Sequence, residues 1–468
     1  MSFNMPKHFS ELKGKRIGIV GLGETGSALA RKLLSWGAEV IAVDAKPLEQ
    51  LKKREEIEKL SRSGLKVITG KDEAEELYKC DMVVISPGVR PDKPFILSLR
   101  RNGVKVTGEV ELAYALCKGR IIAITGTNGK TTTTTLTHHI LSHCKINAFL
   151  VGNIGEPAIS IVDLTDENTW LVMEVSSFQL MTCENFRPHI GVITNIAEDH
   201  LDWHTSADEY LLAKAKMIEK QQDEDFSVLN IDDDGVQKVL GVGKGKRVFF
   251  GFNNTIAHVA PDGEEIVARI PYVGLDKVSL FNLSDFKMPG KHNLLNAMAA
   301  STAALLVGAP ADGIREAISS FKGVPHRLEL IGEFNGVRFI NDSAATTPHA
   351  TLHALLSVNP PVIWIGGGLS KNLNFGLLTE ALRERVKRAI LIGLSKDELC
   401  CVLKALNIPF EVAETLSEAV MSALRTAKPG DTVLFSPACA SLDMFEDYKQ
   451  RGEQFKAIVA ELVCSGEL

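Results

Sequence analysis

An apolar run at residues 121–125 breaks into a short glycine-bounded turn, which is followed directly by Lys130, Thr131 and a helical pattern. In such a strand–turn–helix unit, backbone N–H groups and the helix N-terminus face an anion, the lysine reaches the outer phosphates, and the hydroxyl can ligate Mg²⁺. The usual spacing places a glycine five residues before Gly129, where this chain has Ile124. We therefore interpret the turn as a compact phosphate loop rather than as a strand–helix turn that binds nothing.

Length and composition limit the class of protein. A chain of 468 residues predicts about three domains. Its 24% charged and 45% apolar residues are typical of a soluble globular enzyme. The net charge of −6, with no long basic run, argues against a nucleic-acid partner. Apolar runs fall short of the roughly 20 residues that span a bilayer, and residues 1–15 hold no apolar signal core, so we expect no membrane association.

Cysteine usage indicates the compartment. The eight cysteines lie at positions 80, 117, 144, 183, 400, 401, 439 and 464. None has the spacing of a zinc site, and they are too scattered for a disulfide framework. We interpret most of them as small buried hydrophobic residues and expect a reducing, cytoplasmic compartment.

The first 110 residues alternate short apolar runs with helical patterns, which predicts a parallel sheet. A glycine turn at residues 21–26 follows the first run, Asp44 ends the second, and residues 86–89 form a loop after a later one. Because such a turn can approach a diphosphate and such an acid can bind a ribose, we favour nucleotide-diphosphate binding over a purely structural turn. We expect strands at residues 16–20, 39–43 and 82–85 and a helix at 27–36.

Two further segments follow, and both alternate strand and helix patterns. We expect strands at residues 170–175, 190–196, 338–340, 362–365, 388–392 and 432–435, a β-rich part at 228–286 and an Ala-rich helix at 291–306. The prediction is an α/β fold of three domains, with sites at the carboxyl ends of parallel strands. These are an N-terminal Rossmann-like domain (1–110), a central phosphate-loop domain with a parallel sheet and a small β-rich part (111–325), and a C-terminal Rossmann-like domain (326–468).

Three features accompany the phosphate loop in the central segment. Glu174 ends an apolar run, where it can hold Mg²⁺ or cap the following helix. His200 lies in an Asp-His-Leu-Asp cluster and is either a metal ligand or a satisfied hydrogen-bonding residue. Lys214 and Lys216 point to different faces of one predicted helix, so one can face inward, where a lysine must lose its charge, find a partner or react. The alternative interpretation of Lys214 and of Lys216 is an ordinary lysine exposed to solvent on the surface.

Polar residues also follow the predicted strands of the last segment. They lie at residues 341–347, at Lys371 and at residues 436–441. Small hydroxyl side chains together with a lysine suit a site for a small carboxylate substrate. Taken one by one, these turns would be unremarkable.

Taken together, these segments resemble the Mur ligases, ATP-dependent amide-forming enzymes of peptidoglycan precursor synthesis. The resemblance covers essentially the whole chain. The matching segments are residues 126–131, 174–180, 195–202, 291–296 and 325–327. Residues 436–455, SPACASLDMFEDYKQRGEQF, and the turn at 21–26 are similar to the branch of the family that adds glutamate to UDP-N-acetylmuramoyl-L-alanine.

The resemblance implies a role for each matching residue. Catalysis would rest on Lys130, Glu174, His200 and Lys214, with Lys214 carbamylated by CO₂. Two Mg²⁺ ions would be held by Thr131, Glu174, His200 and the Lys214 carbamate. ATP would be bound by Gly126, Thr127, Asn128, Gly129, Lys130, Thr131, Thr132, Asn296, Arg327 and Asp342. The UDP-sugar would be bound by Gly21, Gly23, Thr25, Gly26, Asp44, Ser86, Gly88 and Asn153, and glutamate by Thr346, Lys371, Ser441 and Tyr448.

The implied reaction proceeds through an acyl phosphate, which the amine of glutamate attacks, in a monomeric enzyme whose C-terminal domain closes to exclude water. One position departs from the family, because a lysine expected beside the glutamate and γ-phosphate site is Ala344. Residues 347–350 are also similar to a divergent branch that adds L-glutamate. We favour D-glutamate and keep L-glutamate as the alternative.

Other functions account for fewer of the motifs. An NAD(P)-dependent dehydrogenase would explain the turn at residues 21–26 and Asp44 but leaves the phosphate loop without a purpose. A binding or regulatory ATPase would form no amide. Folylpolyglutamate synthase shares the ATP-binding and C-terminal domains of the family but lacks the leading Rossmann-like domain.

Overall fold

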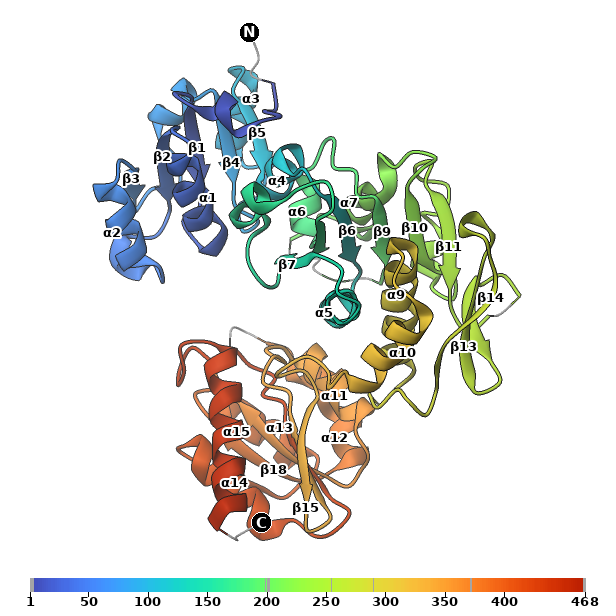
Figure 1. Ribbon diagram of the computed structural model, residues 1–468. Coiled ribbons are helices and arrows are strands. Elements are labelled where there is room, and N and C mark those ends of the chain that lie inside the picture. The colour runs from blue at the N-terminus through green and yellow to red at the C-terminus, as the bar shows by residue number, and fades with distance from the viewer. Residues whose placement is uncertain are drawn as a thin grey trace. The chain divides into compact units, whose positions relative to one another are not determined.

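The computed structural model describes residues 4–197, 199, 203–253, 255–288, 290–370 and 373–465. These residues form three sheets flanked by helices, which confirms the predicted α/β class (Figure 1). Met1–Lys287 and Lys291–Phe321 make up one compact unit, which contains the first two sheets. Met288–Gly290 and Lys322–Leu468 make up the other unit, which contains the third sheet.

The first sheet consists of five parallel strands in the order β3-β2-β1-β4-β5. Its strands are β1 (Arg16–Val20), β2 (Glu39–Asp44), β3 (Lys66–Thr69), β4 (Met82–Ile85) and β5 (Lys105–Gly108), and its helices are α1 (Glu24–Ser35), α2 (Arg54–Arg62) and α3 (Pro94–Arg101). The expected start of the first helix at residue 27 was wrong. The helix begins at Glu24 because Gly23 serves as its N-cap, so the second half of the glycine turn belongs to the helix.

The second sheet has nine strands in the order β14-β13-β12-β11-β10-β9-β6-β8-β7. Pairing is parallel from β7 to β12 and antiparallel from β12 to β14, so the predicted β-rich part extends the parallel sheet at one edge. The strands are β6 (Arg120–Thr125), β7 (Ala148–Gly152), β8 (Trp170–Glu174), β9 (Ile190–Ile193), β10 (Phe226–Asn230), β11 (Lys246–Phe250), β12 (Val259–Asp262), β13 (Glu265–Ile270) and β14 (Leu275–Asn282). The helices are α4 (Glu109–Leu116), α5 (Lys130–His143), α6 (Ser177–Met181), α7 (Ala207–Glu219), α8 (Asp234–Gln237), α9 (Lys291–Val307) and α10 (Ala311–Ser320).

The third sheet has six strands in the order β15-β16-β20-β17-β18-β19, and only β15 runs antiparallel to its neighbour. Apolar clusters cover both of its faces. The strands are β15 (Glu329–Phe334), β16 (Val337–Asn341), β17 (Val362–Gly367), β18 (Val386–Ile392), β19 (Phe410–Val412) and β20 (Thr432–Phe435). The helices are α11 (Pro348–Ser357), α12 (Thr379–Arg385), α13 (Lys396–Ala405), α14 (Leu416–Thr426) and α15 (Tyr448–Ser465).

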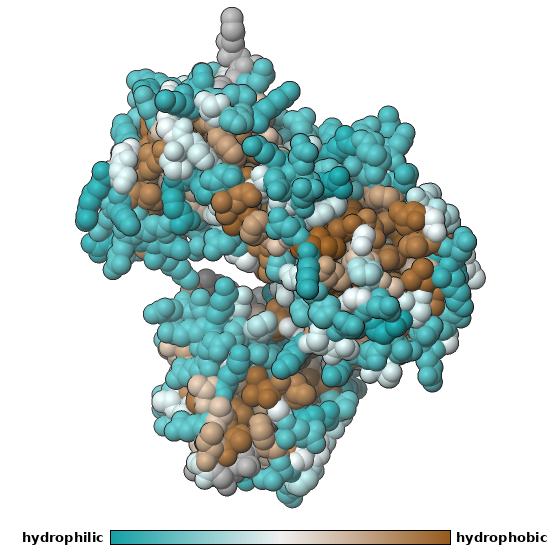
Figure 2. All heavy atoms as spheres, in the orientation of Figure 1, coloured by the Kyte–Doolittle hydropathy of each residue, from teal (hydrophilic) through white to brown (hydrophobic). Residues whose placement is uncertain are grey.

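A shared apolar core joins the first two sheets. Lys32 of α1 forms an ion pair of 2.6 Å with Asp163, and Lys105 of β5 forms one of 2.5 Å with Glu184. The surface outside the cores is mostly hydrophilic on the face shown in Figure 2. Among the described residues, no helix combines the length and the apolar character needed to cross a membrane.

Candidate active site

The phosphate loop connects β6 to α5 and requires glycine at two positions. Gly129 has a φ of +80°, which favours glycine, and a side chain there would also overlap the Asn296 amide. A side chain at Gly126 would overlap the hydroxyl of Thr194. Asn296 thus lies directly against the loop, as its predicted ATP-binding role would require. The loop is fixed by close approach from two sides.

Residues that follow β9 hold the loop by hydrogen bonds. The Asn128 N–H donates to Asn195 Oδ1 (2.8 Å), and Asn195 Nδ2 donates to the Asn128 carbonyl (2.9 Å). Thr194 Oγ1 donates to the same carbonyl (2.7 Å). On the other side, Thr127 Oγ1 lies 3.1 Å from the Tyr210 hydroxyl. Sequence reasoning did not select Thr194 or Tyr210; the only signal for Thr194 was its position directly after a strand next to β6.

Two lysine amines converge on this loop. Lys130 Nζ donates to the carbonyls of Gly126 (2.9 Å) and Thr127 (2.8 Å). Lys214 Nζ, from α7, also donates to the Gly126 carbonyl (2.7 Å) and lies 4.6 Å from the centre of the Tyr210 ring. Burial, and next the positive charge of Lys130, hold the pKa of Lys214 well below its ordinary value. Burial therefore disfavours the charged form of the Lys214 amine.

Neither lysine of α7 is a solvated surface residue. The Lys214 side chain is 1% exposed. Lys216 Nζ donates to the carbonyls of Met181 and Cys183, each at 3.1 Å. The prediction that one of the two faces inward is confirmed for Lys214. Lys216 stabilises the C-terminal end of α6 because a cation there satisfies carbonyls that lack a helical partner.

Glu174 ends β8 beside the loop and carries a carboxylate oxygen with no hydrogen-bond partner. Its side chain is 1% exposed, and Oε1 accepts from Asn153 Nδ2 at 2.8 Å. Oε2 is buried and has no hydrogen-bond partner among the residues that the structure describes. The helix-capping interpretation of Glu174 is wrong, because Ser176 caps α6 in a capping box with Gln179. A buried carboxylate oxygen left in this way fits a cation ligand.

The predicted metal ligands can be placed only in part. Thr131 and Thr132 are half-buried in the first turn of α5, next to the loop. His200 lies outside the described residues. Within the described part of the chain, no three His, Cys, Asp or Glu side chains are grouped as a metal site. The described donors that fit a cation are therefore Glu174 and the Thr131 hydroxyl, joined by Lys214 only if its amine is carbamylated.

The predicted UDP-binding residues of the first sheet gather at the carboxyl ends of β1, β2 and β4. Gly26 belongs to α1, and a side chain there would overlap the Gly21 carbonyl. Ser86 Oγ donates to that carbonyl at 2.8 Å. Asp44 accepts from the Leu22 N–H (2.6 Å) and from the Lys46 N–H (2.8 Å), so it also shapes the turn. By contrast, Gly23 and Gly88 have open space where a side chain would begin, and Thr25 is half-buried in α1.

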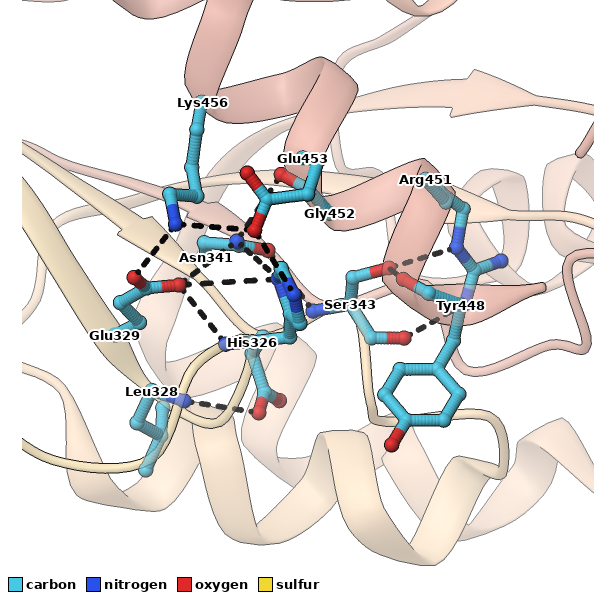
Figure 3. Close-up of polar contacts among 11 residues, drawn as sticks. His326, Leu328, Glu329, Asn341, Ser343, Tyr448, Arg451, Gly452, Glu453 and Lys456 are labelled. Atoms are coloured by element: carbon cyan, nitrogen blue, oxygen red, sulfur yellow. Dashed lines mark hydrogen bonds and ion pairs between the residues drawn. The ribbon is translucent and has the colours of Figure 1, made fainter. Parts of the chain in front are cut away.

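The C-terminal unit contains a network centred on His326, shown in Figure 3. The ring of His326 is bonded at Nδ1 to Asn341 Nδ2 (3.0 Å) and pairs at Nε2 with Glu453 (3.3 Å). Its backbone N–H donates to Glu329 (2.8 Å). Lys456 pairs with both carboxylates at 3.2 Å. Sequence reasoning named residues 325–327 as a matching segment and Arg327 as an implied ATP-binding residue, but it did not predict this network.

The network holds the turn that carries Arg327. His326 and Leu328 have positive φ angles of 64° and 46°, which are unusual for residues other than glycine. The Leu328 N–H donates to Asp342 Oδ1 (3.1 Å), while Arg327 between them is exposed. Burial raises the pKa of Asp342 to about 7. Arg327 and Asp342, both predicted to bind ATP, therefore lie in one connected region of this unit.

The predicted glutamate-binding residues of this unit lie near the carboxyl ends of β16 and β20. Tyr448 begins α15, and its carbonyl accepts from Ser343 Oγ (2.8 Å). Arg451, 1% exposed, donates through Nη2 to the Ser343 carbonyl (2.8 Å) and through Nη1 to the Cys439 carbonyl (3.1 Å). Arg451 thus connects the loop that follows β16 with the loop that follows β20, and Figure 3 shows its bonds to Ser343. The described glutamate-site residues are Thr346 and Ser441, which follow β16 and β20, together with Tyr448; Lys371 lies outside the described residues.

Three family models match the chain. They are "Mur ligase MurD-like, N-terminal domain" at residues 15–108, "Mur ligase middle domain" at 124–304, and "Mur ligase, glutamate ligase domain" at 326–439. The matches therefore extend over the first sheet, most of the second and all of the third.

Relatives named UDP-N-acetylmuramoylalanine–D-glutamate ligase match over nearly their whole length. That of Caldicellulosiruptor saccharolyticus is 40% identical, and the alignment covers 97% of this chain and 100% of the relative. That of Clostridioides difficile has the same identity and coverage. Among solved structures, UDP-N-acetylmuramate-alanine ligase of Thermotoga maritima gives a TM-score of 0.58 at 22% identity, covering 96% of this chain and 99% of that one. The MurF ligase of the same organism, in complex with ADP, gives 0.56 at 16% identity, covering 98% of each chain. At these identities the structures establish a shared fold.

Proposed function

This chain belongs to the Mur ligase family of ATP-dependent amide ligases, and from that premise we propose that it joins D-glutamate to UDP-N-acetylmuramoyl-L-alanine. The observation that carries the proposal is the pair of buried groups beside the phosphate loop: Glu174, with its unpartnered oxygen, and the Lys214 amine, whose pKa is lowered by burial. A dehydrogenase would have no use for either group. A ligase that activates a carboxylate with ATP needs both a cation site and a phosphate cradle at this position.

Mg²⁺ bound here would neutralise charge on the phosphates of ATP. We propose Thr131, Glu174, His200 and a carbamate on Lys214 as its ligands. The structure supports the carbamate through the low pKa of Lys214, since only a neutral amine attacks CO₂. In that step the amine nitrogen bonds to the carbon of CO₂ and loses a proton, so a neutral group becomes an anionic oxygen ligand. The oxygen chemistry of the site then suits Mg²⁺.

The protein's own groups orient and neutralise the reactants. We propose that the N–H groups of residues 126–131 and the N-terminus of α5 hold the phosphates, and that Lys130 moves from the loop carbonyls to the γ-phosphate. The alanyl carboxylate then attacks the γ-phosphorus, and the bond to ADP breaks. The amine of glutamate attacks the acyl carbon, and inorganic phosphate leaves with the bonding electrons.

The remaining residues are proposed as binding residues on the same premise. Residues 21–26, Asp44, Ser86, Gly88 and Asn153 would bind the UDP-sugar, and the Asn153 bond to Glu174 would couple that substrate to the cation site. Asn296, Arg327 and Asp342 would serve ATP. Thr346, Lys371, Ser441 and Tyr448 would serve glutamate. We also propose domain limits at 1–110, 111–325 and 326–468 and a monomeric cytoplasmic enzyme without a nucleic-acid partner, in keeping with the net charge of −6.

The proposal of D-glutamate is supported by the relatives, whose names specify D-glutamate. Residue 344 is alanine where the resemblance implies a lysine near this site, so the L enantiomer is tested in the same experiment. Phosphate release from ATP is measured with Mg²⁺ and UDP-N-acetylmuramoyl-L-alanine, in the presence of D-glutamate, L-glutamate or no amino acid, and the product is weighed by mass spectrometry. Release that requires D-glutamate and gives the amide supports the proposal. Equal release in all three reactions would refute it.

The carbamate has a separate test. In ¹³C-bicarbonate, the wild-type protein should show a carbamate carbon signal by NMR, and the Lys214→Met variant should lose it. Lys216→Met, which removes a neighbouring lysine of the same helix, is the matched control and should keep the signal. A signal that survives in Lys214→Met would place the modification elsewhere.

A further inference from the structure

Helix α11 in the C-terminal unit presents two histidines on one face. His349 and His353 are both exposed and are four residues apart, so they lie on neighbouring turns. Their ring centres are 4.6 Å apart and the rings are inclined at 75°. The ring contact shows that the two imidazoles reach the same point on the surface.

The face of the helix that carries them is fixed by contacts on the opposite side. Thr347 caps α11 by accepting from the Ala350 N–H (3.3 Å). Thr351 Oγ1, fully buried, lies 2.9 Å from Ser436 Oγ. Leu355 is also fully buried, and its carbonyl accepts from Arg385 Nε (2.7 Å). Rotation of the helix is therefore prevented, and the two imidazoles are held on the outward face.

A second histidine pair with the same spacing behaves differently. His139 and His143 of α5 are also four residues apart, but each ring is bonded to a different partner on α10. Nε2 of His139 lies 3.2 Å from the Ala317 carbonyl, and Nε2 of His143 lies 3.0 Å from Glu316. A spacing of four residues on a helix is therefore not enough to bring two histidine rings into contact. The rings of His349 and His353 are in contact.

We propose that His349 and His353 form a binding site for a divalent transition metal ion, with Cu²⁺ and Ni²⁺ as the ions that fit best. An imidazole nitrogen binds such ions at about 2.0–2.1 Å, which puts each ring centre about 3.2 Å from the ion. Two ligands at right angles then have ring centres about 4.5 Å apart, as square-planar and octahedral ions require, whereas a tetrahedral angle gives about 5.2 Å. The observed 4.6 Å is the separation of two rings in edge-to-face contact, so both imidazoles are close enough to share one ion, and the preference for Cu²⁺ and Ni²⁺ follows from their high affinity for imidazole nitrogen.

Two imidazoles leave several coordination positions open. The described residues offer no third His, Cys, Asp or Glu grouped with this pair. The open positions would therefore be filled by water or by a chelating amino acid, whose amine and carboxylate are strong ligands of both ions. Thr346, a proposed glutamate residue, lies three positions before His349. On the basis of the proposed function, metal bound here would slow the use of glutamate.

Binding is tested on the full chain with Ni²⁺, by calorimetry in excess Mg²⁺, which occupies the oxygen-ligand sites. Wild type should bind one Ni²⁺, and His349→Ala and His353→Ala should each weaken that binding by about tenfold or more. His143→Ala is the matched control and should change it by less than twofold. Cu²⁺ electron paramagnetic resonance should show two-nitrogen coupling in wild type and one-nitrogen coupling in each single variant. Equal affinity in all four proteins would overturn the proposal.

Activity provides a separate outcome. Ni²⁺ should raise the apparent KM for glutamate in wild type and leave it unchanged in the His349→Ala, His353→Ala double variant. Ni²⁺ binding with no ligase activity in any protein would refute the proposed function and leave the metal site intact. Ligase activity without histidine-dependent Ni²⁺ binding would refute the metal site alone.

Discussion

The phosphate-loop site and the His326 network differ in whether their buried polar groups have hydrogen-bond partners. Beside the loop, Glu174 keeps an oxygen without a hydrogen-bond partner and Lys214 is buried with a strongly lowered pKa. Around His326, each polar group has partners, and Lys456 balances both nearby carboxylates. A buried carboxylate oxygen without a hydrogen-bond partner and a buried amine with a lowered pKa are both unfavourable for folding, so their occurrence beside the same loop indicates a site built for ligands. The satisfied network instead fixes the backbone that carries Arg327.

The largest expected loss of activity among the variants of a carboxylate tests whether the buried groups beside the phosphate loop serve catalysis rather than stability. Glu174→Gln should lower kcat by about 10²–10³-fold, because a ligand of the catalytic cation is lost. The free energy of unfolding should stay within about 1 kcal/mol of wild type, since the carboxylate oxygen that is replaced makes no hydrogen bond. Steady-state kinetics and urea unfolding measure the two quantities.

Glu111 provides the matched control for Glu174. It is equally buried (2% exposed), but its oxygens accept from the Glu184 N–H (3.1 Å) and the Asn185 N–H (2.8 Å). Glu111→Gln should therefore reduce the free energy of unfolding by about 1–3 kcal/mol and change kcat by only a few fold. If Glu174→Gln destabilised the protein as much as Glu111→Gln does, the contrast between the two regions would not hold.

A second prediction tests the His326 network by steric means. A side chain at Gly452 would overlap the His326 ring, so Gly452→Ala should lower the free energy of unfolding by about 1–3 kcal/mol. Because Arg327 is carried by the same turn, the KM for ATP should rise more than kcat falls. Gly241→Ala is the control, since nothing lies within 4 Å of the added carbon, and it should have little effect on either quantity. Equal effects of the two substitutions would contradict the proposed contact.

A third prediction concerns pH. Burial raises the pKa of Asp342 to about 7, whereas an unfolded aspartate titrates near pH 3.9. The folded state therefore binds the proton more tightly, and the stability that Asp342 contributes is fully present below about pH 4 and is lost as the pH rises through 7. Relative to Asp342→Asn, wild type should lose on the order of 1–3 kcal/mol of unfolding free energy between pH 4.5 and 8.

Urea unfolding at several pH values measures this difference. Asp312→Asn, at a side chain that is 88% exposed, should track wild type across the range. A constant difference between wild type and Asp342→Asn would mean that Asp342 is ionised in the folded protein throughout.

The sequence predicted the catalytic half of this contrast better than the structural half. The phosphate loop and Glu174 lie at the ends of apolar strands, where a short motif and the edge rule for parallel sheets are enough, and the inward lysine was one of two lysines on different faces of a predicted helix. Thr194 and Tyr210 were not predicted as site residues because their contacts depend on the strand order β9-β6-β8, which no local sequence pattern encodes. The contact of His326 with Gly452 joins residues 126 positions apart, and positive φ angles at His326 and Leu328 contradict their local preferences.

The smallest expected change in stability distinguishes the two lysines of α7. Lys216→Met removes two hydrogen bonds to the carbonyls of Met181 and Cys183, so it should lower the free energy of unfolding by about 1 kcal/mol and leave kcat nearly unchanged. Lys214→Met should do the opposite: it abolishes activity, but stability does not fall, because an apolar side chain replaces a buried amine in CO₂-free buffer. Urea unfolding and steady-state rates of both variants, side by side, measure this. If Lys214→Met proved the less stable of the two, its amine would be a structural group that the fold needs, and its low pKa would not indicate a reactive site.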